Sequence, residues 1–141
     1  MPVLGCYWGE RNNPRRKPDT GPDAPAYERA PKVADYFRGV SRPPRAIYTL
    51  ERDWSERAWR KAPVEWVPLD QLHATQDWIS VKGLRHHARP GARPDGNILP
   101  LVVYYRGRWW LFDGHHRAVC AMDRGERRIE AHVRRPGQVA A

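Results

Sequence analysis

The order of the elements predicted in the second half of the chain indicates an α+β fold. From residue 64 onward, the 141-residue sequence predicts a strand, a helix, a β-hairpin, a second helix and a last strand. The hairpin is the clearest of these signals. Two β-rich runs, residues 99–105 and 108–112, flank Arg106-Gly107, where glycine suits a turn with positive φ. We therefore expect a small mixed sheet with helices packed against it.

The elements before the hairpin follow from short apolar runs and from the residues that end them. Residues 64–67 are predicted to form a strand that ends at Pro68, and residues 69–72 a turn or short helix. A helix is predicted over residues 77–86. The run 89–97 holds two prolines and two glycines, which predicts a loop.

The elements after the hairpin are a helix and a strand. Residues 115–124 are predicted to form the helix, and Gly125 follows at the position where a left-handed residue commonly ends one. Residues 129–133 alternate apolar and polar side chains, which predicts the last strand. The helix side chains expected to face the core are Ala118, Val119, Ala121 and Met122.

The first part of the chain differs in composition. Residues 1–63 hold nine of the 14 prolines and show no sustained apolar periodicity. They are predicted to form a Pro- and Arg-rich arm, partly ordered, before a folded domain at residues 64–135 and a tail at 136–141.

Two short helices are expected within this arm, over residues 32–38 and 53–61. Ser55 is placed to cap the second helix. Trp54 and Trp59 indicate that this helix packs against another part of the molecule.

The chain is strongly basic. It carries 25 Lys and Arg residues against 16 Asp and Glu residues, for a net charge of +9. The planar guanidinium group of arginine suits phosphate, so nucleic acid or a phosphorylated small molecule is the natural partner. A high-GC genome would favour a similar composition without any functional cause.

The sequence shows no sign of export or membrane insertion. No apolar run approaches the roughly 20 residues of a membrane span, and the first residues do not resemble a secretory signal. The two cysteines, Cys6 and Cys120, do not form a CxxC pair, which favours a reducing compartment. We expect a cytoplasmic protein that makes no contact with membranes; the oligomeric state is left open.

One motif at the junction of the predicted hairpin and helix has the chemistry of a functional site. In Asp113-Gly114-His115-His116-Arg117, a strand gives way to a helix whose first N–H groups have no intrahelical partner. Gly114 allows close approach of a phosphate, Arg117 supplies a bidentate cation, and the histidines exchange protons near neutral pH. Asp113 is placed to orient a histidine, to cap the helix or to hold a metal ion. The alternative is a solvated corner between strand and helix.

The residues around this junction resemble the ParB/sulfiredoxin superfamily, whose short members are often described as ParB-like nucleases of phages and mobile elements. The resemblance covers residues 64–134. It rests on the run 67–72, on Thr75-Gln76, on the 113–117 motif in its hairpin context, and on Gly125 with the strand after it. It implies a ParB/sulfiredoxin-like small mixed sheet and a nucleotide or nucleic-acid phosphate bound at the junction.

The branches of this superfamily differ at the junction. Partition proteins have Gly-Glu-Arg-Arg there, and no room is left after Val133 for their remaining motifs, so a partition role is not expected. Sulfiredoxins have Gly-Cys-His-Arg, and His115 replaces the cysteine that sulfinic-acid reduction requires. Free-serine kinases have Asp-Gly-His-His-Arg, a full match, together with an upstream glutamate for which Glu65 or Asp70 is the candidate.

The candidate site residues fall into three groups. The catalytic candidates are Asp113, His115 and His116. The phosphate-binding candidates are Gly114, His115 and Arg117, with Thr75 and Gln76, which the resemblance places beside the junction. The candidates for binding nucleic acid are Lys82, Arg85 and Arg89, for which a solvated helix face is the alternative.

Three further groups are assigned mainly structural roles. Cys120 is expected to be a buried small hydrophobe, and His86-His87 a solvated helix end. In the hairpin one pair of aromatic side chains must face the core, and the other is available to stack on bases. The four aromatic residues are Tyr104, Tyr105, Trp109 and Trp110.

The leading hypothesis is a phosphate-binding ParB-like domain that acts on DNA or a nucleotide, as a nuclease or a nucleotide hydrolase. The junction N–H groups and Arg117 would hold the phosphate while a histidine moves the proton. Mg²⁺ and a nucleotide triphosphate are the candidate cofactors, with no dedicated metal-ligand set in the sequence. The alternatives are a free-serine-type small-molecule kinase and a non-catalytic protein that binds DNA or a host factor.

Overall fold

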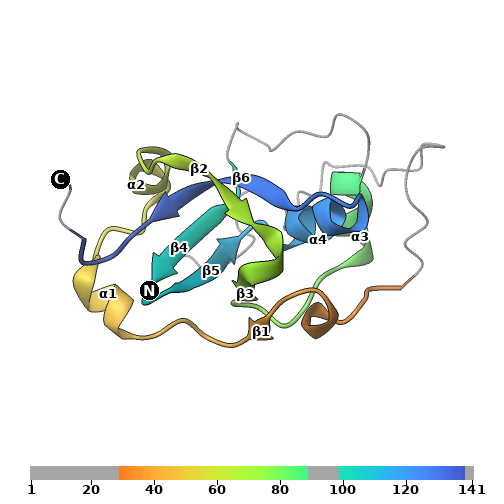
Figure 1. Ribbon diagram of the computed structural model, residues 1–141, viewed down its shortest axis with the longest axis horizontal. Coiled ribbons are helices and arrows are strands. Elements are labelled where there is room, and N and C mark those ends of the chain that lie inside the picture. Colours follow the sequence, from red (N-terminus) through yellow and green to blue (C-terminus); the bar gives the residue numbers. More distant parts are fainter. Residues whose placement is uncertain (1–28, 89–98, 139–141) are drawn as a thin grey trace.

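The computed structural model describes residues 29–88 and 99–138 (Figure 1). Its strands are β1 (Gly39–Val40), β2 (Val64–Pro68), β3 (Leu72–Ala74), β4 (Leu101–Tyr105), β5 (Arg108–Asp113) and β6 (Arg128–Arg134). Its helices are α1 (Ala46–Leu50), α2 (Glu56–Arg60), α3 (Val81–Ala88) and α4 (His115–Asp123), with 3-10 turns at Val33–Asp35 and Leu69–Gln71. The α+β prediction is confirmed.

The strands form one mixed sheet in the order β1-β3-β5-β4-β6-β2. The β4–β5 hairpin and the β2–β6 pair are antiparallel, whereas β1–β3, β3–β5 and β4–β6 are parallel. The strands at the two edges are β1, which has two residues, and β2, which has five. Strand β2 therefore provides the longer edge of the described sheet.

Each face of the sheet is covered by its own apolar cluster because the side chains of the central strands alternate. Val102 and Leu111 belong to a core with Leu84 of α3 and Val119 of α4. The neighbouring strand residues point the other way, into a second cluster formed with α1, Trp54 and α2. The strand residues of that cluster are Leu101, Val103, Tyr105, Trp110 and Phe112. In Figure 1, α3 and α4 lie at one end of the molecule, and α1 and α2 at the other.

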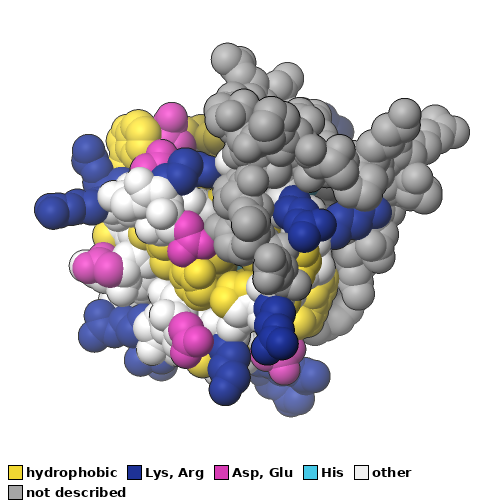
Figure 2. Space-filling view, turned by 90° about the vertical axis from the view of Figure 1, so that its right-hand side faces the viewer, with side chains coloured by type: hydrophobic (Ala, Val, Ile, Leu, Met, Phe, Trp, Pro, Cys, Tyr) yellow, Lys and Arg dark blue, Asp and Glu magenta, His cyan; other side chains and the backbone are white. Residues whose placement is uncertain are grey.

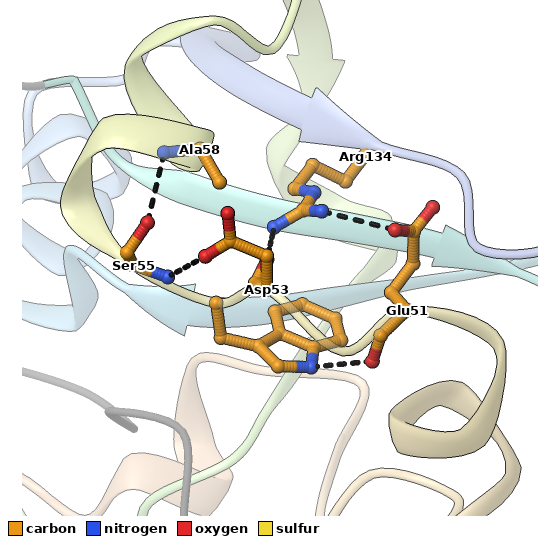
Figure 3. A network of polar contacts seen from close by, with 6 residues as sticks. Glu51, Asp53, Ser55, Ala58 and Arg134 are labelled. Atoms are coloured by element: carbon orange, nitrogen blue, oxygen red, sulfur yellow. Dashed lines mark hydrogen bonds and ion pairs between the residues drawn. The ribbon is translucent and has the colours of Figure 1, made fainter.

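Arg134, at the end of β6, joins the sheet to the segment that connects α1 and α2 (Figure 3). Its guanidinium donates to the carbonyl of Asp53 at 2.6 Å and to the carboxylate of Glu51 at 3.1 Å. It also stands over the rings of Trp54 and Trp59, with centroid distances of 4.8 and 5.3 Å. This cation–π arrangement holds Trp54 and α2 against the sheet.

Ser55 caps α2, as the sequence predicted. Its hydroxyl accepts the N–H of Ala58 at 3.2 Å, while its own N–H donates to the carboxylate of Asp53 at 3.0 Å. Hydrogen bonds from Ser55, together with the charge of Arg134, lower the pKa of Asp53. The expected packing of Trp54 and Trp59 is confirmed, since both rings are buried.

The predictions near the hairpin are confirmed and those before it are only partly right. The turn has positive φ at Arg106 and Gly107, and Gly125 ends α4 in the left-handed region. The helix predicted over 77–86 begins later, at Val81, because Ser80 accepts the N–H of Gly83 and starts the first turn there. The sequence did not predict β3, which is buried throughout and lacks alternation.

The segment before residue 64 contributes to the fold where the structure describes it. Residues 39–40 pair with β3, and the tryptophans of the 53–61 region fill the second core. The helix expected over 32–38 is shorter, a 3-10 turn at Val33–Asp35. The division of the chain at residue 63 stays a prediction. The loop expected at 89–97, with Arg89, lies outside the described residues, as do Cys6 and residues 139–141 of the tail.

The hairpin aromatics divide between the two faces. Tyr105 and Trp110 are buried, as expected for the core pair. Tyr104 and Trp109 are half-buried, and the guanidinium of Arg135 stands over both rings at 5.4 and 5.9 Å from their centroids.

Arg135 also forms a bidentate ion pair with Glu65 on β2, in which one contact is 2.8 Å. Because of this pair, the pKa of Glu65 is lowered and that of Arg135 is raised.

Candidate functional site

The junction between β5 and α4 is built around one glycine. Gly114 has φ 101° and ψ 21°, a left-handed conformation that residues with a side chain rarely adopt. A Cβ atom at this position would lie 2.7 Å from Cβ of Pro100. The N–H of Gly114 donates to Oδ1 of Asp113 at 2.9 Å. Glycine is therefore required here both by the turn and by the close approach of the chain before β4.

His115 points from the first turn of α4 into the core. It is completely buried, and its Nε2 accepts the backbone N–H of Thr75 at 3.2 Å. Accepting at Nε2 requires the neutral tautomer that carries its proton on Nδ1. The ring also meets Phe37 edge-on, with 5.6 Å between ring centroids. His115 thus connects α4 to the chain that leaves β3.

His116 makes the equivalent connection to α3. It is also completely buried, and its Nε2 accepts the backbone N–H of Ser80 at 2.9 Å. The ring lies so close to α3 that a Cβ atom at Gly83 would come within 2.4 Å of its Cδ2. The Trp78 ring contacts it from another side, with centroids 5.9 Å apart.

The two histidines therefore hold the strand–helix junction against residues about 40 positions earlier in the chain. Their whole residues, backbone included, are shielded from solvent, and Asp113 and Gly114 are buried too. A ligand at the first N–H groups of α4 would have to displace these packed groups. The arrangement of residues 113–116 is that of an internal cross-link.

The other candidate residues are only partly brought together. Thr75 lies at the junction, where its hydroxyl donates to the carbonyl of Leu111 at 2.7 Å, and the Gln76 amide donates to the carbonyl of Trp78 at 2.8 Å. Lys82 is exposed and Arg85 is half-buried on α3. A role for any of them in binding phosphate or nucleic acid is untested.

A pocket of about 220 Å³ lies beside α4. Arg117 is the one member of the 113–117 motif that lines it, which places this side chain away from the buried histidines. Strand β6 supplies Arg128 and Glu130, and β2 supplies Trp66. The guanidinium of Arg128 stands over the Trp66 ring at 5.4 Å. The remaining lining residues are His87, Leu99, Pro100, Ala121, Arg124, Glu126 and Ile129.

Apart from Arg117, the sequence did not indicate the residues that line this pocket. Trp66 lies between Glu65 and Val67 and has the appearance of an ordinary alternating strand residue. Its position before Pro68, which suits an edge strand, was the available signal. His87 was expected at a solvated helix end, which is wrong: the residue is buried and its carbonyl accepts from Arg124 at 3.3 Å.

The pKa values of Tyr36 and His73 are shifted by their surroundings. The Tyr36 hydroxyl donates to both carboxylate oxygens of Asp123, at 2.9 and 3.1 Å. Burial, followed by this hydrogen bond and the charge of Asp123, raises the pKa of Tyr36 to about 12. Burial, with the nearby charge of Arg108, lowers the pKa of His73, whose Nε2 lies 2.8 Å from the hydroxyl of Ser41.

The described residues contain no group of three or more His, Cys, Asp or Glu side chains arranged to hold a metal ion. The use of Mg²⁺ or a nucleotide triphosphate stays a prediction.

Within residues 29–88 and 99–138, no helix is both long and apolar enough to cross a membrane. The buried thiol of Cys120 donates to the carbonyl of Leu84 at 3.3 Å.

Comparison with known families decides between the interpretations of this fold. The model of the antitoxin VapB-like family matches residues 42–136, more than half of the chain. The chain belongs to the antitoxin VapB-like family. The match runs from the residues before α1 to the end of β6 and so includes the junction, the pocket and the Arg134 contacts. Searches of curated proteins and of solved structures gave no match.

This family membership overturns the resemblance to the ParB/sulfiredoxin superfamily. The nuclease, nucleotide-hydrolase and kinase hypotheses are wrong for an antitoxin VapB-like chain, and so is the description as a phosphate-binding phage protein. The physical source of the error is the Asp-Gly-His-His-Arg motif. Its glycine and histidines have the residue types of a phosphate site, whereas here they make the turn and the buried cross-link.

Proposed function

We propose that this chain is an antitoxin, which binds a protein toxin and holds it inactive without itself catalysing a reaction. The observation that carries the proposal is the family match over residues 42–136. The burial of both junction histidines is consistent with it, because each histidine accepts a backbone N–H of its own chain.

Growth rescue tests this proposal directly. Genomic fragments from the organism that encodes the chain are placed under an inducible promoter, with and without co-expression of the chain. We expect at least one fragment to arrest growth only when the chain is absent, and its product to co-purify with the chain. If no fragment at several-fold genome coverage depends on the chain, the antitoxin proposal fails.

DNA is a second candidate partner, favoured by the net charge of +9. On the side of the molecule drawn in Figure 2, Lys and Arg side chains occupy several separate positions with Asp and Glu between them. Such a distribution suits contacts with phosphates more than base recognition by one element. Lys82 and Arg85 on α3 contribute to this net positive charge.

Fluorescence anisotropy with two unrelated duplexes tests the DNA proposal. Binding that relies on about four to six phosphate contacts weakens more than about a hundredfold between roughly 50 and 200 mM salt. A strong preference for one duplex that persists at high salt would contradict this mode, and an absence of binding at low salt would remove DNA as a partner.

A further inference from the structure

The outer edge of β2 presents backbone groups that β6 does not use. The N–H of Val133 donates to the carbonyl of Pro63 at 2.8 Å, and the N–H of Leu69 donates to the carbonyl of Arg127 at 2.9 Å. In the antiparallel register these bonds place the odd-numbered residues of the 63–69 segment in hydrogen-bonded pairs with β6. The N–H and C=O groups of Val64 and Trp66 therefore point to the outer edge.

Large apolar side chains are exposed on the same two residues. Trp66 is 56% exposed and Val64 is 47% exposed. Their neighbour Val67 is buried in the core with α3 and α4, so both side chains lie on the opposite face of the sheet. An exposed hydrophobic edge of this kind is normally blunted by charge or covered by a partner. Within residues 29–88 and 99–138 no strand lies beyond it.

The pocket beside Trp66 adds charge to this edge. Its wall holds three arginines against two glutamates, and Arg124 is paired with Glu126 at 2.9 Å. The acid of β2 itself, Glu65, is engaged by Arg135. A strand laid along β2 would thus meet a surface whose net charge is positive.

We propose that the outer edge of β2, with Trp66 and the adjoining pocket, is the docking site for an extended acidic segment of the toxin. The segment adds to the sheet as a further strand, pairing with the N–H and C=O groups of Val64 and Trp66. One of its apolar side chains covers Trp66, and one of its carboxylates lies toward Arg128, whose guanidinium stands over the Trp66 ring. The identity of the partner as a toxin rests on the proposed function; the docking site itself does not.

Charge argues against a second copy of this chain as the occupant. Each copy carries +9, so two edges brought together repel, whereas an acidic segment is attracted.

Labelled peptides of eight residues test the site on the full chain without any toxin. One alternates valine with glutamate, a second alternates valine with lysine, and a third is the acidic peptide with N-methyl groups on four consecutive central residues. We expect the acidic peptide to raise fluorescence anisotropy with saturation, and the other two to bind at least about tenfold more weakly. No saturable binding by the acidic peptide, or equal binding by all three, overturns the proposal.

Variants then assign the binding to β2. Trp66→Ala and Val64→Pro should each weaken the acidic peptide about tenfold or more. Val64→Pro removes one outward donor without removing a bond to β6. Val64→Thr keeps that donor, and Trp78→Ala removes a tryptophan that is 39% exposed elsewhere, so both should bind within about twofold of the wild type. Circular dichroism and melting temperature establish that each variant is folded. If Trp66→Ala, folded, binds as the wild type does, the site lies elsewhere.

The toxin recovered by growth rescue separates the two proposals. Wild type and Trp78→Ala should neutralise it, whereas Trp66→Ala should not. If the wild type, Trp78→Ala and Trp66→Ala all neutralise the toxin equally, the docking site is wrong and the antitoxin function is still supported. Acidic-peptide binding that depends on Trp66, with no toxin found in the genome, supports the docking site and removes the antitoxin function. Sedimentation of the wild type checks the remaining occupant, because dimers lost in Trp66→Ala would assign this edge to a second copy.

Discussion

Replacing His116 by alanine is the most direct test of the conclusion that the junction histidines are structural. The substitution removes a completely buried ring and leaves the N–H of Ser80 without the acceptor that it has at 2.9 Å. A buried large-to-small change costs about 2–5 kcal/mol, and an unsatisfied buried donor about 1–3 kcal/mol. The two overlap where water enters the space, so we expect the free energy of unfolding to fall by about 3–5 kcal/mol.

A loss of this size is a large part of the roughly 5–15 kcal/mol that stabilises a typical domain. At about 3 °C for each kcal/mol in a chain of this length, the melting temperature should fall by roughly 10–15 °C. His116→Gln places an amide oxygen near the position of Nε2 and should recover at least about 1 kcal/mol of the loss. Urea denaturation followed by circular dichroism measures all three proteins.

A double-mutant cycle with Gly83 makes the test specific to the packing. In the wild type, Gly83→Ala places a methyl group 2.4 Å from the His116 ring and should destabilise the protein. In the His116→Ala background the methyl group fills part of the space, and alanine is also the better helix former by about 1 kcal/mol. Gly83→Ala should therefore be neutral or stabilising there. Additive effects, or a His116→Ala protein as stable as the wild type, would refute the cross-link.

Three further predictions concern other buried contacts. Gly114→Ala should lower the free energy of unfolding by at least about 2 kcal/mol, because alanine is strained at this positive φ and its Cβ would clash with the Cβ of Pro100. A urea titration that shows the same stability for the variant and the wild type would contradict this. The lowered pKa of His73 means that the unfolded chain takes up the proton more readily, so stability should decline as pH falls below about 6.5, and His73→Gln should lack this part of the decline in thermal melts. Tyr36 should ionise only near pH 12 in an ultraviolet titration, and its hydrogen bond to Asp123 should stabilise the fold fully below pH 10 and progressively less above it. Tyr36→Phe should lose that dependence and about 1 kcal/mol at neutral pH.

The parts of the fold that local chemistry determines were predictable from the sequence. The hairpin turn needs positive φ at Gly107, and α4 ends at Gly125 for the same reason, so both positions are marked by residue type. By contrast, β3 is three buried residues whose partners, residues 39–40 on one side and 109–111 on the other, lie far away in the sequence. Parallel pairing between segments so far apart produces no recognisable pattern in the local sequence.

The function inferred from the candidate site was wrong for a related reason. Asp-Gly-His-His-Arg has the same residue types whether its histidines face a ligand or the core. What distinguishes the two cases is the position of Thr75 and Ser80, whose N–H groups meet the rings from 40 and 36 residues away. The expected α+β class did not depend on these contacts, whereas the chemistry of the site depended on them entirely.

The pairing of β2 with β6 has a consequence for the growing polypeptide. Strand β2 is made early, at residues 64–68, but its only partner among the described strands occupies residues 128–134. During synthesis on the ribosome, the chain therefore carries an unpaired β2 until β6 has left the exit tunnel. Trp66 takes its place beside Arg128 at the same late moment. Because of the order of translation, this edge is one of the last parts of the molecule to fold.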